Sequence, residues 1–180
     1  MRRKNRSVRL QNWNYNSKGI YLITVCTKHR VHYFGEVEKG RMILSDIGEF
    51  VQNEWLQTPF IRPDMKLELG DYVVMPDHLH LILIINENIY NQESGYDSKE
   101  SLNQNHSLNV QKKNVGSVIR GFKSAVTSFA RKNNIKFEWQ RLYWEHLIRS
   151  ETELAALSSY IRNNPTNWGK KMNPLNSEIG

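Results

Sequence analysis

Two histidines, two residues apart in an apolar run, constrain this chain more than any other feature. Residues 71–85 read Asp-Tyr-Val-Val-Met-Pro-Asp-His-Leu-His-Leu-Ile-Leu-Ile-Ile and contain His78 and His80. Side chains at i and i+2 of a β-strand point to the same face, so both imidazoles are expected together, with Leu79 turned into a core. Two imidazoles on one face can supply half of a divalent-metal site. The pair still needs a third ligand and a reactive partner before it indicates chemistry.

Length and composition predict one domain in a reducing compartment. The 180 residues can bury a proper core. No apolar stretch approaches the ~20 residues of a membrane-spanning helix, and the basic N-terminus lacks the apolar stretch of a secretory signal. A single cysteine, Cys26, rules out an internal disulfide, and it lies in a strand-like run where a core position is expected. We therefore expect a cytoplasmic protein without membrane association.

The positive charge is concentrated at the N-terminus. Residues 1–18 hold six Lys or Arg residues and no acid, which accounts for nearly all of the net charge of +7. Such an arm can bind phosphate backbones or can be a disordered, solubilising tail. The candidate phosphate-binding residues in it are Arg2, Arg3, Arg6 and Arg9.

The order of expected elements is β-α-β-β-α-β with a closing helix. Strands are expected at 19–27, 65–75, 78–86 and within 137–149, and helices at 45–57, 115–133 and 151–164, with a turn-rich hairpin at 28–41. Pro59 and Pro63 are expected to end the first helix, and Pro165 the last. This order predicts an α+β ferredoxin-like sandwich, an antiparallel sheet with helices packed on one face and a C-terminal tyrosine helix. It is expected to span residues 19–168, between the arm at 1–18 and a tail at 169–180.

Residues 86–114 differ in composition from the rest of the domain. They are rich in Asn and Gln, poor in apolar residues and without visible period, so we expect a flexible insertion that carries no chemistry. A second positive region follows it, with Arg120, Lys123 and Arg131 on one side of the helix at 115–133. Aromatic residues lie among the Lys and Arg residues that follow, and positive charge beside aromatic rings suits single-stranded nucleic acid. For Trp144, a position in the core is the favoured interpretation.

The closing helix offers what the histidines lack. Tyr160 and Asn164 are spaced i and i+4, which places them on one helix face. The amide oxygen of Asn164 is a suitable hard ligand for Mg²⁺ or Mn²⁺, and the phenol of Tyr160 can attack phosphorus. Tyr143 is a rival nucleophile, although it has no carboxamide partner four residues on.

Two segments of the chain resemble a known family. The segment MPDHLHLI is similar to the HUH motif of single-tyrosine transposases, and WQRLYWEHLIRSETELAALSSYIRNNP resembles the C-terminal signature of the REP-associated tyrosine transposases. The resemblance covers roughly residues 19–168. It implies that His78 and His80 bind a divalent metal, Mg²⁺ or Mn²⁺, that Tyr160 is the nucleophile and that Asn164 is the third ligand. Glu145 and His146 match a WEH element of the family, for which active-site support and a purely structural role both stay open.

The resemblance implies a metal-dependent enzyme that cleaves and rejoins single-stranded DNA beside hairpins through a 5′-phosphotyrosine intermediate. The alternative is a non-catalytic single-stranded nucleic-acid-binding module with the same fold, and a third reading is a metal phosphodiesterase that uses water. The sequence leaves open whether the protein is a monomer or a homodimer, and whether the tyrosine acts in its own subunit or in the partner's. It also leaves open whether the protein is the transposase of a mobile element or a resident housekeeping enzyme.

Overall fold

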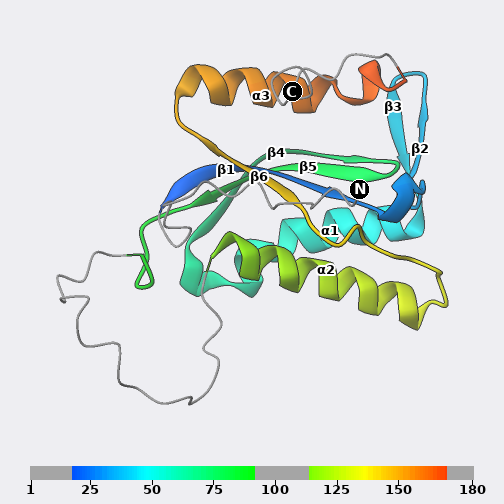
Figure 1. Ribbon diagram of the computed structural model, residues 1–180, viewed down its shortest axis with the longest axis horizontal. Coiled ribbons are helices and arrows are strands. Elements are labelled where there is room, and N and C mark those ends of the chain that lie inside the picture. The colour runs from blue at the N-terminus through cyan, green and yellow to red at the C-terminus, as the bar shows by residue number, and fades with distance from the viewer. Residues whose placement is uncertain (1–17, 92–113, 170–180) are drawn as a thin grey trace, which may run out of the picture.

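The described part of the chain, residues 18–91 and 114–169, forms three layers around one antiparallel sheet in a computed structural model (Figure 1). The sheet has the order β4-β5-β1-β6. Its strands are β1 (Gly19–Cys26), β4 (Leu67–Met75), β5 (His78–Ile85) and β6 (Trp144–Ile148). With the helices α1 (Asp46–Ile61) and α2 (Val115–Lys132) between strands, this is the ferredoxin-like arrangement that the sequence predicts.

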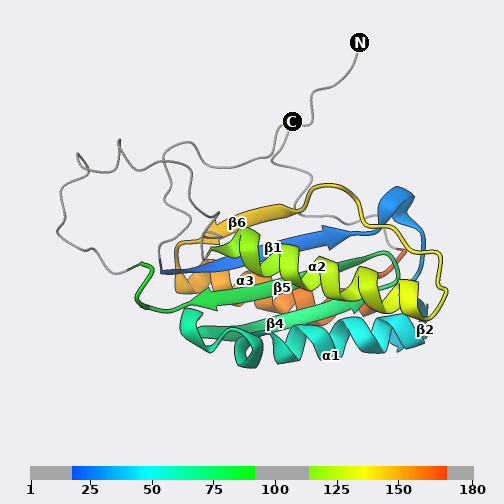
Figure 2. The ribbon, with the colours of Figure 1, turned by 90° about the horizontal axis from the view of Figure 1, so that it is seen from below.

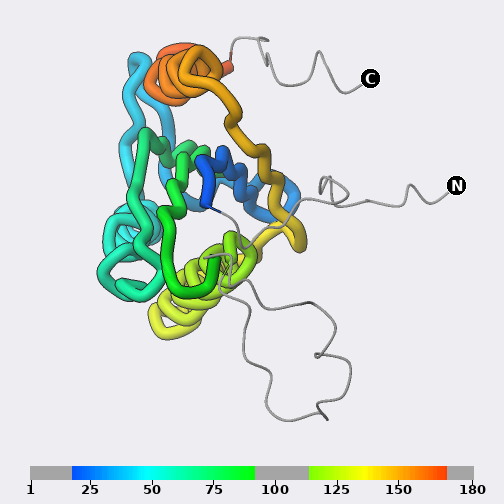
Figure 3. Tube along the Cα trace, turned by 90° about the vertical axis from the view of Figure 1, so that its left-hand side faces the viewer, coloured from blue at the N-terminus to red at the C-terminus, as the bar shows by residue number. Residues whose placement is uncertain are grey.

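Strand alternation divides the sheet into two faces of different composition. On β5, Leu79, Leu81 and Leu83 belong to the large core beneath α1 and α2, whereas Ile82 belongs to a smaller cluster on the other side. The amphipathic helices α1 and α2 cover the first face (Figure 2). The closing helix α3 (Glu151–Asn163) lies alone across the second face (Figure 3).

The tyrosine helix α3 is fixed at several points. Ser150 caps its N-terminus by accepting a hydrogen bond from the Glu153 N–H at 3.1 Å. Ile161 is fully buried against Leu22 and Ile82 of the sheet. Near the helix C-terminus, Arg162 donates a hydrogen bond from Nη1 to Asp71 Oδ2 at 3.0 Å.

A β-bulge in the edge strand β4 places Asp71 for this ion pair. The pairing of β4 with β5 shifts between Leu69 and Tyr72, so the strand gains residues that have no cross-strand partner. Gly70 lies in this interval, where a Cβ would come within 2.7 Å of Ile82 Cγ2. A larger residue at position 70 would therefore collide with β5.

A small hairpin of β2 (Gly35–Glu38) and β3 (Arg41–Leu44) supports the segment after α3. Its two turn residues, Lys39 and Gly40, both have positive φ, as the tight turns that match strand twist require. The ideal Cβ position of Gly40 lies 3.4 Å from the Thr166 backbone. The hairpin falls within and just beyond the range expected for it.

The first helix is longer than the sequence predicts. Ser45 is its N-cap, as expected, but Pro59 lies inside the helix, which continues to Ile61. Pro59 removes one i→i−4 hydrogen bond, but it lies so near the C-terminus that only two further residues follow it in the helix, and Pro63 begins the 3₁₀ turn that comes next. The expectation that Pro59 ends the helix was therefore wrong, and that for Pro63 is confirmed.

Residues 86–91 are hydrogen-bonded to the domain, and the rest of the expected insertion, 92–113, lies outside the described residues. Asn88 is buried and donates from Nδ2 to the Met65 carbonyl at 3.0 Å. Asn114 forms a capping box with Ser117 at the start of α2. None of the helices in residues 18–91 and 114–169 combines the length and apolarity that crossing a bilayer requires.

The large core predicts where truncation destabilises the fold. We expect Leu81→Ala to lower the free energy of unfolding by about 2–5 kcal/mol, because Leu81 is fully buried on a central strand. The control is Ile43→Ala, which also truncates an aliphatic side chain to alanine but at an exposed position of the hairpin. It is expected to lower the free energy of unfolding by less than about 1 kcal/mol. Urea denaturation followed by circular dichroism measures both, and equal effects would contradict this core.

Candidate metal and tyrosine site

His78 and His80 lie on the face of β5 that α3 crosses. Leu79 between them is fully buried in the opposite core, as the alternation predicts. The two imidazole centroids are 4.7 Å apart, with their planes at 77°. Both residues are buried, at 8% and 5% exposed. The strand therefore presents two imidazoles together, sheltered from bulk water.

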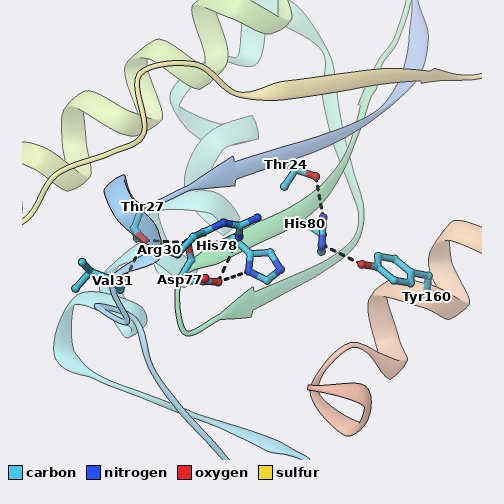
Figure 4. Close-up of polar contacts among 8 residues, drawn as sticks. All are labelled: Thr24, Thr27, Arg30, Val31, Asp77, His78, His80 and Tyr160. Carbon is cyan, nitrogen blue, oxygen red and sulfur yellow. Dashed lines mark hydrogen bonds and ion pairs between the residues drawn. The ribbon is translucent and has the colours of Figure 1, made fainter. Parts of the chain in front are cut away.

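Each imidazole is held through its Nδ1 atom. Thr24 on β1 is the cross-strand partner of His80, and its Oγ1 lies 2.8 Å from His80 Nδ1. The Asp77 carboxylate accepts a hydrogen bond from His78 Nδ1 at 2.5 Å (Figure 4). With Nδ1 engaged in both rings, Nε2 is left as the ligand atom. Outer partners of this kind orient metal-binding histidines in known sites.

Burial keeps His80 neutral. Desolvation, helped by the nearby charges of His78 and Arg30, lowers the pKa of His80 to about 3, although Asp77 acts in the opposite direction. Burial alone raises the pKa of the Asp77 carboxyl, but the hydrogen bond and charge of His78 and the charge of Arg30 outweigh it, so that pKa is lowered. A neutral imidazole beside an ionised carboxylate is the protonation state that metal binding requires.

The phenol of Tyr160 faces His80 from α3. Its hydroxyl oxygen lies 3.5 Å from His80 Nε2, and the two ring centroids are 5.3 Å apart (Figure 4). Tyr160 also packs against the small apolar cluster formed by α3 and the sheet. The structure thus brings the expected nucleophile and the histidine pair together within one chain.

Asn164 follows Tyr160 by one helical turn, at the C-cap of α3. Its backbone N–H donates to the Ile161 carbonyl at 3.2 Å. In residues 18–91 and 114–169 no three His, Cys, Asp or Glu side chains form a group that could hold a metal. The role of Asn164 stays a prediction.

Four further residues lie around the histidines and were not predicted from the sequence: Thr24, Arg30, Asp77 and Trp168. Asp77 adjoins His78 in the sequence and could have been found as a hydrogen-bond partner. Trp168, just after α3, stacks its ring on His78 with centroids 6.0 Å apart and also contacts His32. Thr24 is identified only by the β1–β5 register, and Arg30 only by the fold of the loop after β1.

The WEH element divides between the two faces of the sheet. Glu145 is buried and accepts a hydrogen bond from the Tyr143 hydroxyl at 3.0 Å, and Tyr143 packs against the core beneath α1 and α2. The rival nucleophile is thereby turned away from the histidines. His146 lies on the α3 side, stacked parallel to Trp144 and 2.6 Å from the Glu153 carboxylate.

The helix α2, which carries the second group of basic residues, packs on the face of the sheet opposite the histidines (Figure 1). Arg120 and Arg131 are exposed there. Lys123 instead donates from Nζ to the Gln140 carbonyl at 2.7 Å and lies over the Trp139 ring, and burial lowers its pKa. Its ammonium is thus engaged within the protein. The four arginines of the arm, at positions 2, 3, 6 and 9, lie outside the described residues.

Comparison with known proteins gives relatives along most of the chain. No family model matches. An uncharacterized protein of Haemophilus influenzae is 38% identical over 167 residues, covering 91% of this chain and 89% of the relative. A second protein of that organism, named "Putative REP-associated tyrosine transposase", is 29% identical over 161 residues, covering 87% of this chain and 75% of the relative.

The fold has a counterpart among solved structures. The structure of a REP-associated tyrosine transposase bound to a REP hairpin superposes with a TM-score of 0.56 at 20% identity, covering 90% of this chain and 75% of that chain. At this identity the likeness concerns the fold. The chain thus resembles, along most of its length, a protein named as a putative REP-associated tyrosine transposase, and it shares the fold of a solved structure of that kind.

Proposed function

We propose that this protein is a metal-dependent DNA transposase or endonuclease that cleaves and rejoins single-stranded DNA beside hairpins, with Tyr160 as its nucleophile. The observation that carries the proposal is the 3.5 Å approach of the Tyr160 hydroxyl to His80 Nε2, from an element remote in sequence. The named relative supports a transposase role, and the solved structure of that family holds a REP hairpin.

The residues present fit a divalent metal ion. His78 and His80 offer two Nε2 atoms, both oriented through Nδ1, and His80 is neutral at physiological pH. Asn164 is the proposed third ligand, one turn beyond Tyr160. A bound Mg²⁺ or Mn²⁺ supplies Lewis-acid withdrawal of charge from a non-bridging oxygen of the scissile phosphate.

The chain's own part in the reaction is to position the phenol. The rigid helix α3 holds Tyr160 against the histidine pair, so that its oxygen can approach phosphorus in line with the departing 3′ oxygen. The oxygen–phosphorus bond forms, the phosphorus–3′-oxygen bond breaks, the phenol loses its proton and the 3′ oxygen gains one. The 5′-phosphotyrosine keeps the bond energy, so a 3′-OH can reverse the step without a nucleotide cofactor.

Hairpin recognition is proposed to use surfaces outside this site. The arginines at positions 2, 3, 6 and 9 and the exposed Arg120 and Arg131 are the candidates for phosphate contacts. Because the hydroxyl and the histidines meet within one chain, the proposal requires no partner subunit for cleavage.

The nucleophile is tested with Tyr160→Phe. Wild-type protein incubated with a hairpin oligonucleotide carrying a single-stranded extension and Mn²⁺ should give a covalent protein–DNA adduct on a denaturing gel. The Phe variant should give none, with affinity for the same DNA within about threefold of wild type, because only the hydroxyl is removed. Tyr143→Phe is the matched control and should keep the adduct. Cleavage without any adduct in wild type would favour attack by water, and binding without cleavage would favour a non-catalytic module.

Orientation of the metal ligand is tested with Thr24→Val, which removes the hydroxyl beside His80 Nδ1 with little change in volume. We expect Mn²⁺ affinity, measured by titration calorimetry, to fall by roughly 10–100-fold, as for other outer partners of histidine ligands. Thr24→Ser keeps the oxygen and should bind nearly as wild type does. Unchanged affinity in the Val variant would mean that the ring needs no such support.

Removal of residues 1–9 tests the arm. The truncated protein should bind the hairpin more weakly, with a shallower dependence of affinity on salt, because fewer counterions are released. Fluorescence anisotropy at several salt concentrations measures both. Identical affinity and slope would assign the arm no part in binding.

A further inference from the structure

A cationic side chain outside the residues assigned so far lies at the histidine pair. Arg30 belongs to the short 3₁₀ turn Lys28–Arg30 that follows β1. Its Nη1 atom is 3.5 Å from Asp77 Oδ1, the carboxylate that also binds His78. Figure 4 shows its guanidinium beside the His78 imidazole. Its charge contributes to the lowered pKa of His80, so its field reaches the second imidazole as well.

The backbone of this turn is held in a conformation that costs energy. His29 and Arg30 both have left-handed dihedrals, with φ of 57° and 56°, which side chains with a Cβ adopt reluctantly. Thr27 fixes the turn, because its N–H and its hydroxyl both donate to the Asp77 carbonyl and the hydroxyl also contacts the Val31 carbonyl. Strained residues of this kind gather at functional sites.

The contact with Asp77 does not account for this arrangement. At 3.5 Å it is longer than a good charge-assisted hydrogen bond, and the Arg30 side chain remains 55% exposed. Ion pairs this exposed stabilise a fold very little. A guanidinium has five N–H donors, and this contact engages one of its nitrogens.

Neighbouring cations are engaged at closer range. Lys28 is bonded to Glu138, and Arg162 to Asp71. Arg30 therefore retains donors for an anion beside His78, to which it is joined through Asp77.

We propose that Arg30 binds a non-bridging oxygen of the scissile phosphate and stabilises the charge that develops there as Tyr160 attacks. The inference rests on the proposed function and names a further catalytic residue for it. A planar guanidinium fork suits two phosphate oxygens, and a cation already placed beside the site can stabilise charge that develops in the transition state. Asp77 then links the two components, because its Oδ1 atom accepts from both His78 Nδ1 and Arg30 Nη1.

Arg30→Gln tests the proposal in two independent measurements. The first is binding of the hairpin oligonucleotide in EDTA, without any metal, by fluorescence anisotropy. Loss of one phosphate contact should lower the slope of log affinity against log salt by about 0.7. The second is the single-turnover rate of adduct formation at saturating DNA and Mn²⁺, which should fall roughly 100–1,000-fold.

Two variants serve as controls. Arg149→Gln removes the same charge at the far end of the sheet, just after β6, and should leave the rate unchanged. Arg30→Lys keeps the charge without the fork, so it should restore most of the salt slope but only part of the rate. Thermal denaturation of each variant confirms that the fold is retained.

Other outcomes would overturn the proposal. A rate and salt slope equal to those of Arg149→Gln would show that Arg30 does not touch the phosphate. A rate loss that higher Mn²⁺ restores would show that Arg30 acts only through Asp77 and His78. Adduct formation by wild-type protein in the same series tests the proposed function separately, so that either inference can fail while the other stands.

Discussion

The antiparallel pairing of β1 with β5 is the interaction on which the site depends. It sets Thr24 opposite His80 and Cys26 opposite His78, so one ladder fixes both histidines and the hydroxyl that orients one of them. A shift of one residue would turn the imidazoles into the leucine core and bring Leu79 to the surface that α3 covers. The leucines at 79, 81 and 83, all fully buried, disfavour that shift, and packing energy thereby fixes the position of a polar site.

The second requirement is that α3 lies on the correct part of the sheet, and here the contacts are fewer. Its apolar cluster is small, centred on Leu22, Ile82, Ile148 and Ile161, whereas α1 and α2 share the large core. The hydrogen bond from Arg162 to Asp71 and the approach of the hairpin tip to Thr166 are further contacts at this end of the helix. Both lie near the C-terminal turn of α3, which is the turn that carries Tyr160. The strand bulge at Gly70 and the turn at Gly40 thus lie next to the contacts around the turn that carries Tyr160, the proposed nucleophile.

The sequence predicts what depends on local pattern. Alternation along 78–85 places the histidines on one face, and the cap, stripe and proline signals locate the helices to within a few residues, with Pro59 as the exception. It does not predict what depends on long-range register. Thr24 is an ordinary strand residue until β1 is paired with β5, and Glu145 and His146 are neighbours in sequence that the sheet separates onto opposite faces. Arg30 is hidden for another reason, since its direction follows from two left-handed residues that no propensity favours.

The charges around the histidines suit an anionic substrate. A site made of carboxylates would hold a cation tightly but would repel a DNA strand. Here burial keeps the His80 imidazole neutral, and the Asp77 carboxylate beside the pair is shared by His78 and Arg30. Within the described residues, the negative charge beside the histidine pair is therefore balanced, as the proposed DNA substrate would require. The same desolvation that neutralises the imidazole also strengthens any charge-assisted contact made to the phosphate in that place.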